Sequence, residues 1–262
     1  MSYSEINSNV ITFTKGKLEV KIYPNREEMG KEAAKNVSDT IQKQLQQHDE
    51  INMIFAAAPS QSDFMKELIS DKFIQWERIN AFHMDEYIGL EKDAPQGFGN
   101  FLKDHIFSKV PFKSVHYING QANDPMKECE RYSDLMNQYP VDIVCLGIGE
   151  NGHIAFNDPP VADFNDPLLV KVVELEMACR QQQVNEKLFA SIELVPTHAI
   201  TVTIPGLLKA KYMFCMVPAK NKAEAIYHTL NDEISEKCPA TILRTKEDTI
   251  LYLDEESSSL LN

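Results

Sequence analysis

The sequence predicts an α/β fold of the Rossmann-like kind, with a mainly parallel sheet that carries helices on both faces. Helical and strand patterns alternate along the chain, as repeated βαβ units require. The run "VDIVCLG" at 141–147 is almost entirely apolar, as a central parallel strand must be. The 262 residues show no internal repeat and no low-complexity linker, so we treat 1–262 as a single domain.

The first half of the chain supplies a long helix followed by two strand–helix pairs. Within 23–45, apolar residues recur every four positions, and Asn25 and Glu28 stand where a helix is capped. The segments 51–57 and 78–84 are typical of buried strands, and 62–69 and 98–107 are typical of short helices.

In the second half, Asp124 and Pro125 predict the start of another helix, which leads to the apolar strand at 141–147. Four further strand-like segments and two helices follow. The strands are expected at 170–175, 198–204, 211–217 and 249–253, and the helices at about 178–190 and 219–230. We expect the serine-rich end, 254–262, to fray.

The composition excludes several classes of partner. A net charge of −13 argues against nucleic acid and anionic membranes, and no run of eighteen apolar residues is present. The first residues do not resemble a secretory signal. The five cysteines include no C-x-x-C pair, so we expect reduced, buried thiols rather than disulfides or metal ligands, and a cytoplasmic protein. A homo-oligomer is compatible with the sequence, which does not set the number of subunits.

Polar clusters follow three of the predicted strands. They are "AAPSQS" at 57–62, "MDEY" at 84–87 and "GIGENGH" at 147–153. Because ligands of open α/β sheets bind beyond the carboxyl ends of the strands, we expect these three segments to line one crevice.

Two of the clusters carry groups suited to acid–base chemistry. Glycines such as Gly149 allow a ligand to approach the backbone closely, and an imidazole held by a carboxylate, as in His153 with Asp158, has a fixed tautomer. A carboxylate at a strand end, Asp85 or Glu86, can take a carbon-bound proton next to a carbonyl. A core histidine and a solvated turn are the alternative interpretations.

Arg180 and Lys222 are the candidate cations for an anionic ligand. The alternative for each is a solvated helix face. If the ligand is an anion, the cations that hold it must be few and local, because the chain as a whole is acidic.

Taken together, "MDEYIGL" at 84–90 and "GIGENGHIAFNDP" at 147–159 resemble the two signatures of the glucosamine-6-phosphate deaminase family. That family shares a superfamily with the 6-phosphogluconolactonases, whose corresponding motifs look different. The resemblance spans about residues 20–253. It implies an aldose–ketose isomerisation with deamination, which converts glucosamine 6-phosphate to fructose 6-phosphate and ammonia. That chemistry needs a base, an acid and groups that hold an anion, so we expect neither a metal nor an organic cofactor. The sequence itself offers no clear cluster of metal ligands.

The resemblance also implies roles for individual residues. Asp85 matches the base that moves a proton between C2 and C1 of the opened sugar, and His153 matches the group that assists ring opening. Asp158 stands where the family has the Glu that orients this histidine, and Asn151 where many members have an Asp of the same relay. The phosphate-binding and substrate-binding positions correspond to Ser60, Glu86, Gly149, Arg180 and Lys222.

Three departures from the family pattern leave alternatives open. The phosphate loop, usually T-G-G-[ST]-P, is "AAPSQ" at 57–61, which keeps the hydroxyl of Ser60 but lacks both glycines. Asp158 is one methylene shorter than Glu. Asn151 cannot pass on a proton, so the relay is either shorter here or completed by another group, for which Glu150 is a candidate. A galactosamine 6-phosphate substrate, a lactonase and a sugar-phosphate sensor without turnover therefore remain as rivals.

Overall fold

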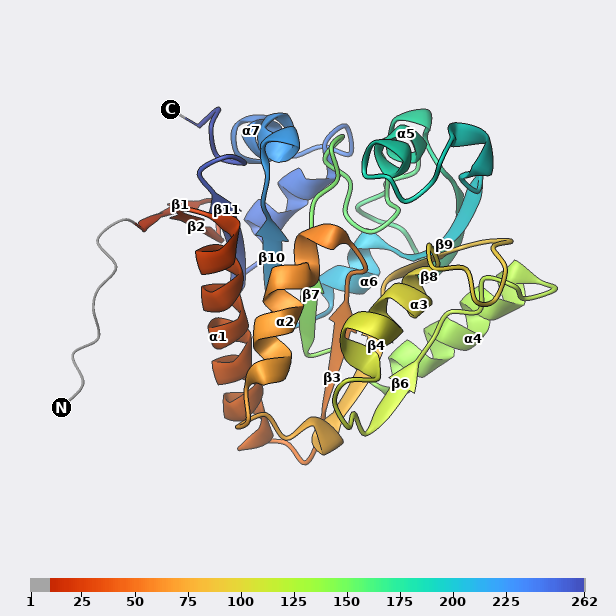
Figure 1. Ribbon diagram of the computed structural model, residues 1–262, viewed down its shortest axis with the longest axis horizontal. Coiled ribbons are helices and arrows are strands. Elements are labelled where there is room, and N and C mark those ends of the chain that lie inside the picture. The colour runs from red at the N-terminus through yellow and green to blue at the C-terminus, as the bar shows by residue number, and fades with distance from the viewer. Residues whose placement is uncertain (1–9, 262) are drawn as a thin grey trace.

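An eight-stranded sheet forms the centre of the molecule (Figure 1), whose computed structural model describes residues 10–261. All neighbouring strands are parallel except the first pair, which confirms the predicted fold class. The order of the strands across the sheet is β1 (Ile11–Lys15), β2 (Leu18–Tyr23), β11 (Thr249–Asp254), β10 (Tyr212–Val217), β7 (Ile143–Leu146), β3 (Ile51–Phe55), β4 (Ile79–His83) and β6 (Ser114–His116).

Helices cover both faces of this sheet because the strand residues alternate between two hydrophobic cores. Met53 and Phe55 of β3 belong to one core, and Ile54 between them belongs to the other. The helices of the first core are α1 (Arg26–Leu45), α2 (Ser62–Ser70) and α3 (Phe98–Leu102), which a π-helical turn extends through Lys103–Phe107. Those of the second core are α4 (Pro125–Gln138), α6 (Ile204–Leu208) and α7 (Ala223–Asn231).

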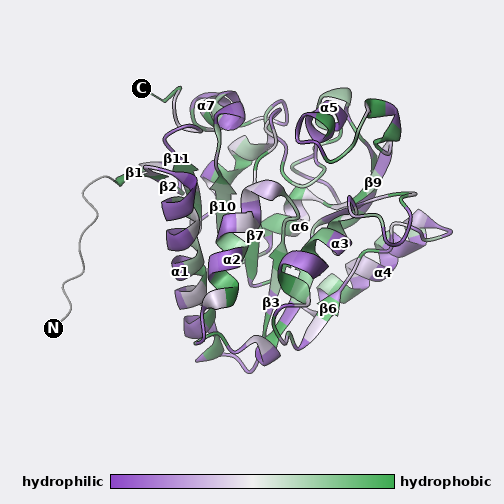
Figure 2. Cartoon of the chain, viewed as in Figure 1, coloured by the Kyte–Doolittle hydropathy of each residue, from purple (hydrophilic) through white to green (hydrophobic). Residues whose placement is uncertain are grey.

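The first helix forms as its sequence predicts. The side chain of Asn25 accepts a hydrogen bond from the backbone N–H of Glu28 at 2.9 Å, which caps α1. Met29, Ala33, Val37 and Ile41 lie on its buried face. The outward face of α1 is hydrophilic, whereas the strands behind it are mostly hydrophobic (Figure 2).

A second, three-stranded sheet is separate from the first. It contains β5 (Asp85–Tyr87), β9 (His198–Val202) and β8 (Val170–Glu174), all antiparallel. The segments at 170–175 and 198–204 are therefore strands, as predicted, but they are not part of the parallel sheet. This small sheet carries Asp85 on the strand that immediately follows β4.

Residues 254–261 are packed rather than frayed, so that expectation is wrong for them, and residue 262 lies outside the described residues. Ser257 is fully buried, and its backbone N–H donates to Asp254 Oδ1 at 2.8 Å. Ser258 is also buried, and its hydroxyl donates to the carbonyl of Asp254 at 2.9 Å. The residues after β11 thus form a turn that Asp254 holds in place.

The strand order identifies one position in the sheet where a ligand crevice is expected. From β3 the chain adds β4 and β6 on one side, whereas β10 and β11 extend the sheet beyond β7 on the other. The direction of growth reverses between β3 and β7, and open α/β sheets bind their ligands beyond the carboxyl ends of strands at such a reversal.

The described residues give two further findings, one on membrane-spanning helices and one on cysteines. No helix within residues 10–261 combines the length and the apolar character needed to cross a membrane. All five cysteines are buried and free, as predicted.

Candidate active site

A pocket lies where the reversal in strand order predicts it, between the segments that follow β3 and β7. All three polar clusters of the sequence contribute to it. Residues 57–60 come from the first cluster, Met84 and Asp85 from the second, and Gly147, Gly149 and His153 from the third. The other side of the pocket is formed by α5 (Met177–Asn185), its following residues and Lys222 after β10.

Asp85 lines the pocket although its side chain is almost completely shielded from solvent, with 6% of the residue exposed. Burial raises the pKa of this carboxyl well above its usual value, and the neighbouring charge of Glu86 raises it further. A carboxylate with a raised pKa is a stronger base, which suits proton abstraction from carbon.

Glu86 faces away from the pocket, so the two adjacent carboxylates have different surroundings. Its carboxylate accepts hydrogen bonds from the backbone N–H groups of Tyr87, Phe98 and Gly99 at 2.8–3.0 Å. These bonds lower the pKa of Glu86, but burial outweighs them and the pKa is raised. The geometry gives Glu86 the task of holding the start of α3 and does not bring it to the ligand, contrary to the sequence-based assignment.

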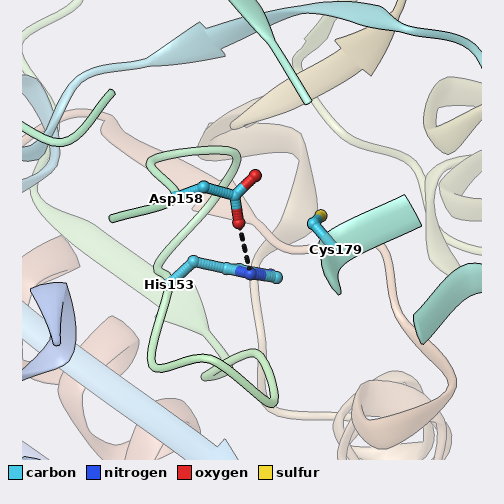
Figure 3. Close-up of side chains that lie close together, drawn as sticks. All are labelled: His153, Asp158 and Cys179. Atoms are coloured by element: carbon cyan, nitrogen blue, oxygen red, sulfur yellow. Dashed lines mark ion pairs between the residues drawn. The ribbon is translucent and has the colours of Figure 1, made fainter. Parts of the chain in front are cut away.

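His153 and its two polar neighbours, Asn151 and Asp158, form a continuous network. Its Nδ1 lies 2.9 Å from Asp158 Oδ1 and 2.7 Å from Asn151 Oδ1, and Figure 3 shows the imidazole directed toward the Asp158 carboxylate. Burial alone would raise the pKa of Asp158, but the charge of His153 and the hydrogen bonds to this carboxylate lower it below its usual value. Asp158 is fully buried. The short distance between the two side chains shows that the pairing predicted from the sequence is present in the structure.

The hydrogen-bond network around His153 includes Glu176, which the sequence does not indicate. Asn151 Nδ2 donates both to Asp158 Oδ1 at 3.0 Å and to Glu176 Oε2 at 2.7 Å. The Asn151 amide therefore connects two carboxylates. The acidic residue that extends the network beyond Asn151 is Glu176 and not Glu150. Glu150 instead accepts a hydrogen bond from Asn221 Nδ2 at 2.7 Å. Only the fold reveals this, because Glu176 lies 25 residues from Asn151.

Gly149 is required because the imidazole of His153 lies directly over its backbone. A Cβ atom at this position would come within 2.1–2.4 Å of three ring atoms. The backbone N–H of Gly149 also donates to the carbonyl of His153 at 2.9 Å. Gly152 closes the turn with φ +82°, a conformation that glycine adopts without strain.

Cys179, on α5, comes close to the same pair (Figure 3). Its sulfur, a ring nitrogen of His153 and an Asp158 oxygen all lie within 4.8 Å of one another, a set that could hold a metal ion. The sequence does not indicate this group, because Cys179 is brought to the other two residues only by the fold. Burial and the Asp158 charge raise the pKa of the Cys179 thiol well above its usual value. The Asp158 carboxylate already accepts hydrogen bonds from His153 and Asn151.

Lys222 is the one lysine or arginine among residues 10–261 that lines the pocket. Its Nζ lies 3.7 Å from Glu186 Oε1, and its side chain is 7% exposed. Burial lowers the pKa of Lys222, while the charges of Glu186 and Glu150 act in the opposite direction.

The loop before Lys222 has an unusual backbone conformation at Ala219. Ala219 has φ +83°, a region that side chains rarely adopt. Its N–H donates to both carboxylate oxygens of Asp254 at 3.1 Å, which holds the loop against the end of β11.

The altered loop after β3 presents Ser60 to the pocket without glycines. Gln61 is fully buried behind it, and its Nε2 donates to Met216 O at 3.1 Å and Ser60 Oγ at 3.2 Å. The oxygen of the Gln61 amide has no hydrogen-bond partner among the described residues. The side chain of Gln61 therefore supports the loop from within, next to Gly147.

Arg180 does not line the pocket, although the resemblance assigns it to phosphate. Its Nη2 donates to the carbonyls of Ile192 and Val195 at 2.7 and 2.9 Å. The guanidinium thus connects α5 to the segment before β9. Gln182, Gln183 and Glu186 from the same part of the chain reach the pocket instead.

Comparisons with known proteins agree on one group of relatives. A family model described as glucosamine-6-phosphate isomerases/6-phosphogluconolactonase matches residues 24–252. A glucosamine-6-phosphate deaminase from Exiguobacterium sibiricum is 35% identical over 229 residues, or 87% of this chain and 88% of the relative. One from Bacillus cereus is 39% identical over 183 residues, or 70% of this chain and 68% of the relative.

Solved structures extend the comparison to the fold. A monomeric glucosamine-6-phosphate deaminase aligns with a TM-score of 0.83 and 31% identity, covering 92% of this chain and 99% of the other. A 6-phosphogluconolactonase from Thermotoga maritima aligns with a TM-score of 0.74, covering 91% of this chain and 100% of the other. At 22% identity, the lactonase shows only that the fold is shared.

Proposed function

The chain belongs to the glucosamine-6-phosphate isomerase/6-phosphogluconolactonase family, and from this premise we propose that it converts glucosamine 6-phosphate and water to fructose 6-phosphate and ammonia. The observation that carries the proposal is that Asp85 and His153, the latter paired with Asp158, line one pocket. The sequence motifs around Asp85 and His153 are those of the deaminase branch rather than the lactonase branch.

Ring opening is the first task, and His153 is proposed to perform it. The imidazole moves a proton between O1 and the ring oxygen of the sugar, which breaks the C1–O5 bond and leaves an aldehyde. Asp158 and Asn151 hold the ring of His153 through Nδ1, so its Nε2 is the atom available to the substrate. Glu176 fixes the orientation of the Asn151 amide.

Asp85 is proposed to carry out the proton shift that follows. It takes the proton from C2, giving an enolamine, and returns it to C1, giving an iminium at C2. Water then adds to C2, and ammonia leaves as the ketone forms. The raised pKa of Asp85 supports both halves of the shift, because the carboxyl must accept the proton and then release it.

The phosphate group is proposed to bind in the part of the pocket that Ser60 and Lys222 line. The hydroxyl of Ser60 can donate one hydrogen bond, and Lys222 supplies a charge. Five buried free thiols support a reducing compartment, and we place the enzyme in the cytoplasm.

The test is ammonia release from purified protein, measured in parallel with glucosamine 6-phosphate and galactosamine 6-phosphate. We expect release from the gluco substrate with the higher kcat/KM. Preference for the galacto substrate would change the assigned sugar. Hydrolysis of 6-phosphogluconolactone without ammonia release would assign the protein to the lactonase branch, and binding of both amino-sugar phosphates without turnover would indicate a sensor.

A further inference from the structure

The phosphate end of the pocket contains a carboxylate that sequence reasoning did not anticipate. Glu186, just after α5, lines the pocket together with Lys222. Its Oε1 lies 3.7 Å from Lys222 Nζ, so the charge available to a phosphate is already partly compensated by the protein. Arg180, the second cation implied by the resemblance, is bonded to the carbonyls of Ile192 and Val195 and does not line the pocket.

Glu186 is held in this position by other side chains. Gln182 Nε2 donates to Glu186 Oε1 at 2.8 Å, and Gln182 Oε1 accepts from the backbone N–H of Glu150 at 3.0 Å. Gln182 is 7% exposed. The carboxylate is thus pre-oriented toward Lys222 by a buried amide that is itself anchored to the loop after β7.

The consequence for an incoming anion follows from charge alone. A phosphate dianion at Lys222 must share the ammonium with Glu186, and like charges at close range disfavour each other, more so where the surroundings exclude water. We infer that Glu186 weakens phosphate binding by pairing with Lys222. This inference rests on the proposed function only in placing the phosphate group at Lys222.

Replacing Glu186 by Gln tests the inference with little change of shape. The Gln oxygen can still accept the hydrogen bond from Gln182, while the negative charge is removed. We expect KM for glucosamine 6-phosphate to fall about tenfold, a change typical of removing a like charge near a bound anion. The change in kcat should stay within about twofold, because Glu186 lies at the binding end of the pocket.

Two further variants calibrate this result. Glu150→Gln should lower KM by a smaller factor, because Glu150 acts on Lys222 less strongly than Glu186 does. Glu224→Gln makes the same charge change on the exposed first turn of α7, which does not line this pocket, and should leave KM unchanged.

Binding of inorganic phosphate, measured by calorimetry, separates this inference from the proposed reaction. The Glu186→Gln variant should bind phosphate about tenfold more tightly than the parent even if neither releases ammonia. Glucosamine without phosphate should bind to the variant and to the parent with the same affinity. Equal phosphate affinity in parent and variant would overturn the inference. A KM that rises for phosphorylated and unphosphorylated sugar alike would do so too, because Glu186 would then bind the sugar itself.

Discussion

The two ends of the pocket differ in how their charged groups are arranged. At the chemical end, Asp158 and Asn151 bond to His153, and the network continues to Glu176, so the polar groups support one another. At the anion end, Lys222 faces Glu186. The negative charge of Glu186 partly cancels the positive charge that would attract a phosphate. In the function we propose, the first arrangement serves the reaction, whereas the second limits how tightly the phosphate is held.

This difference indicates how the two ends should respond to substitution. Groups at the chemical end act on the reacting atoms, so their loss should lower kcat. Groups at the anion end act on a part of the substrate that does not react, so their loss should change KM. Variants that mix the two effects would show that the division is wrong.

The largest effect is expected for Asp85→Asn, which keeps the shape of the side chain but removes the base. We expect kcat to fall by about 10²- to 10⁴-fold, the range for general acid–base catalysis. Turnover of the parent in heavy water should place solvent deuterium at C1 of the ketose, and the variant should lose this incorporation together with ammonia release. Retained incorporation would assign the proton shift to another residue.

The same variant has a predicted effect on stability and pH. A carboxyl with a raised folded-state pKa favours folding below its unfolded pKa, and this contribution is lost as pH rises through the folded pKa. Asp85→Asn removes this pH dependence, so its free energy of unfolding should gain on that of the parent as pH rises, which denaturant titration at several pH values measures. In the parent, the acidic limb of kcat/KM should lie above the ordinary aspartate pKa of about 3.9.

Asp158→Asn should have the next largest effect, again on kcat. The amide keeps a hydrogen-bonding group beside His153 but removes the negative charge, so kcat should fall by about one to three orders of magnitude. KM should change little. Steady-state kinetics across pH measure both quantities, and a kcat profile of unchanged height and acidic limb would show that Asp158 does not assist His153.

Lys222→Met tests the anion end with a smaller effect of the other kind. Methionine fills a similar volume without the charge, and the lost charge-assisted bond to phosphate contributes about 1.5 to 3 kcal/mol, so KM should rise roughly 10- to 150-fold. The kcat at saturating substrate should be much less affected. If kcat fell as far as in Asp158→Asn with KM unchanged, Lys222 would belong to the chemical end.

Arg180→Ala should have the smallest effect on kinetics. The resemblance implies a strong rise in KM, whereas the structure places the guanidinium on two backbone carbonyls. We expect KM within about twofold of the parent, since the side chain does not line the pocket. The lost hydrogen bonds should instead lower the free energy of unfolding by about 1 to 2 kcal/mol, measured by denaturant titration. A large rise in KM would restore the sequence-based assignment.

Strands with strong apolar patterns could be predicted from the sequence, but their partners could not. The segments that became β3, β4 and β7 read as buried strands, and their polar ends do meet at one pocket. The segments of β8 and β9 carry the same local signal, yet they pair antiparallel with β5. Alternation of apolar residues reports burial, and it does not identify the neighbouring strand.

The site was predictable where chemistry is encoded in a short motif. His153 and Asp158 lie five residues apart, and the structure pairs them. Glu176 and Glu186 act through residues distant in sequence, so no local pattern marks them. Arg180 shows the opposite error, because a motif position cannot show which way a long side chain turns.

The position of Asp254 has a practical consequence for anyone handling the protein. This carboxylate holds both Ala219, in the loop before Lys222, and Ser257, in the final turn of the chain. The segment after β11 thus helps to hold the loop that carries Lys222, and it is not free to be altered without effect. A purification tag fused there is best separated by a flexible spacer. Trimming the chain back to β11 would keep Asp254 but remove Ser257, whose backbone N–H bonds the same carboxylate that holds Ala219.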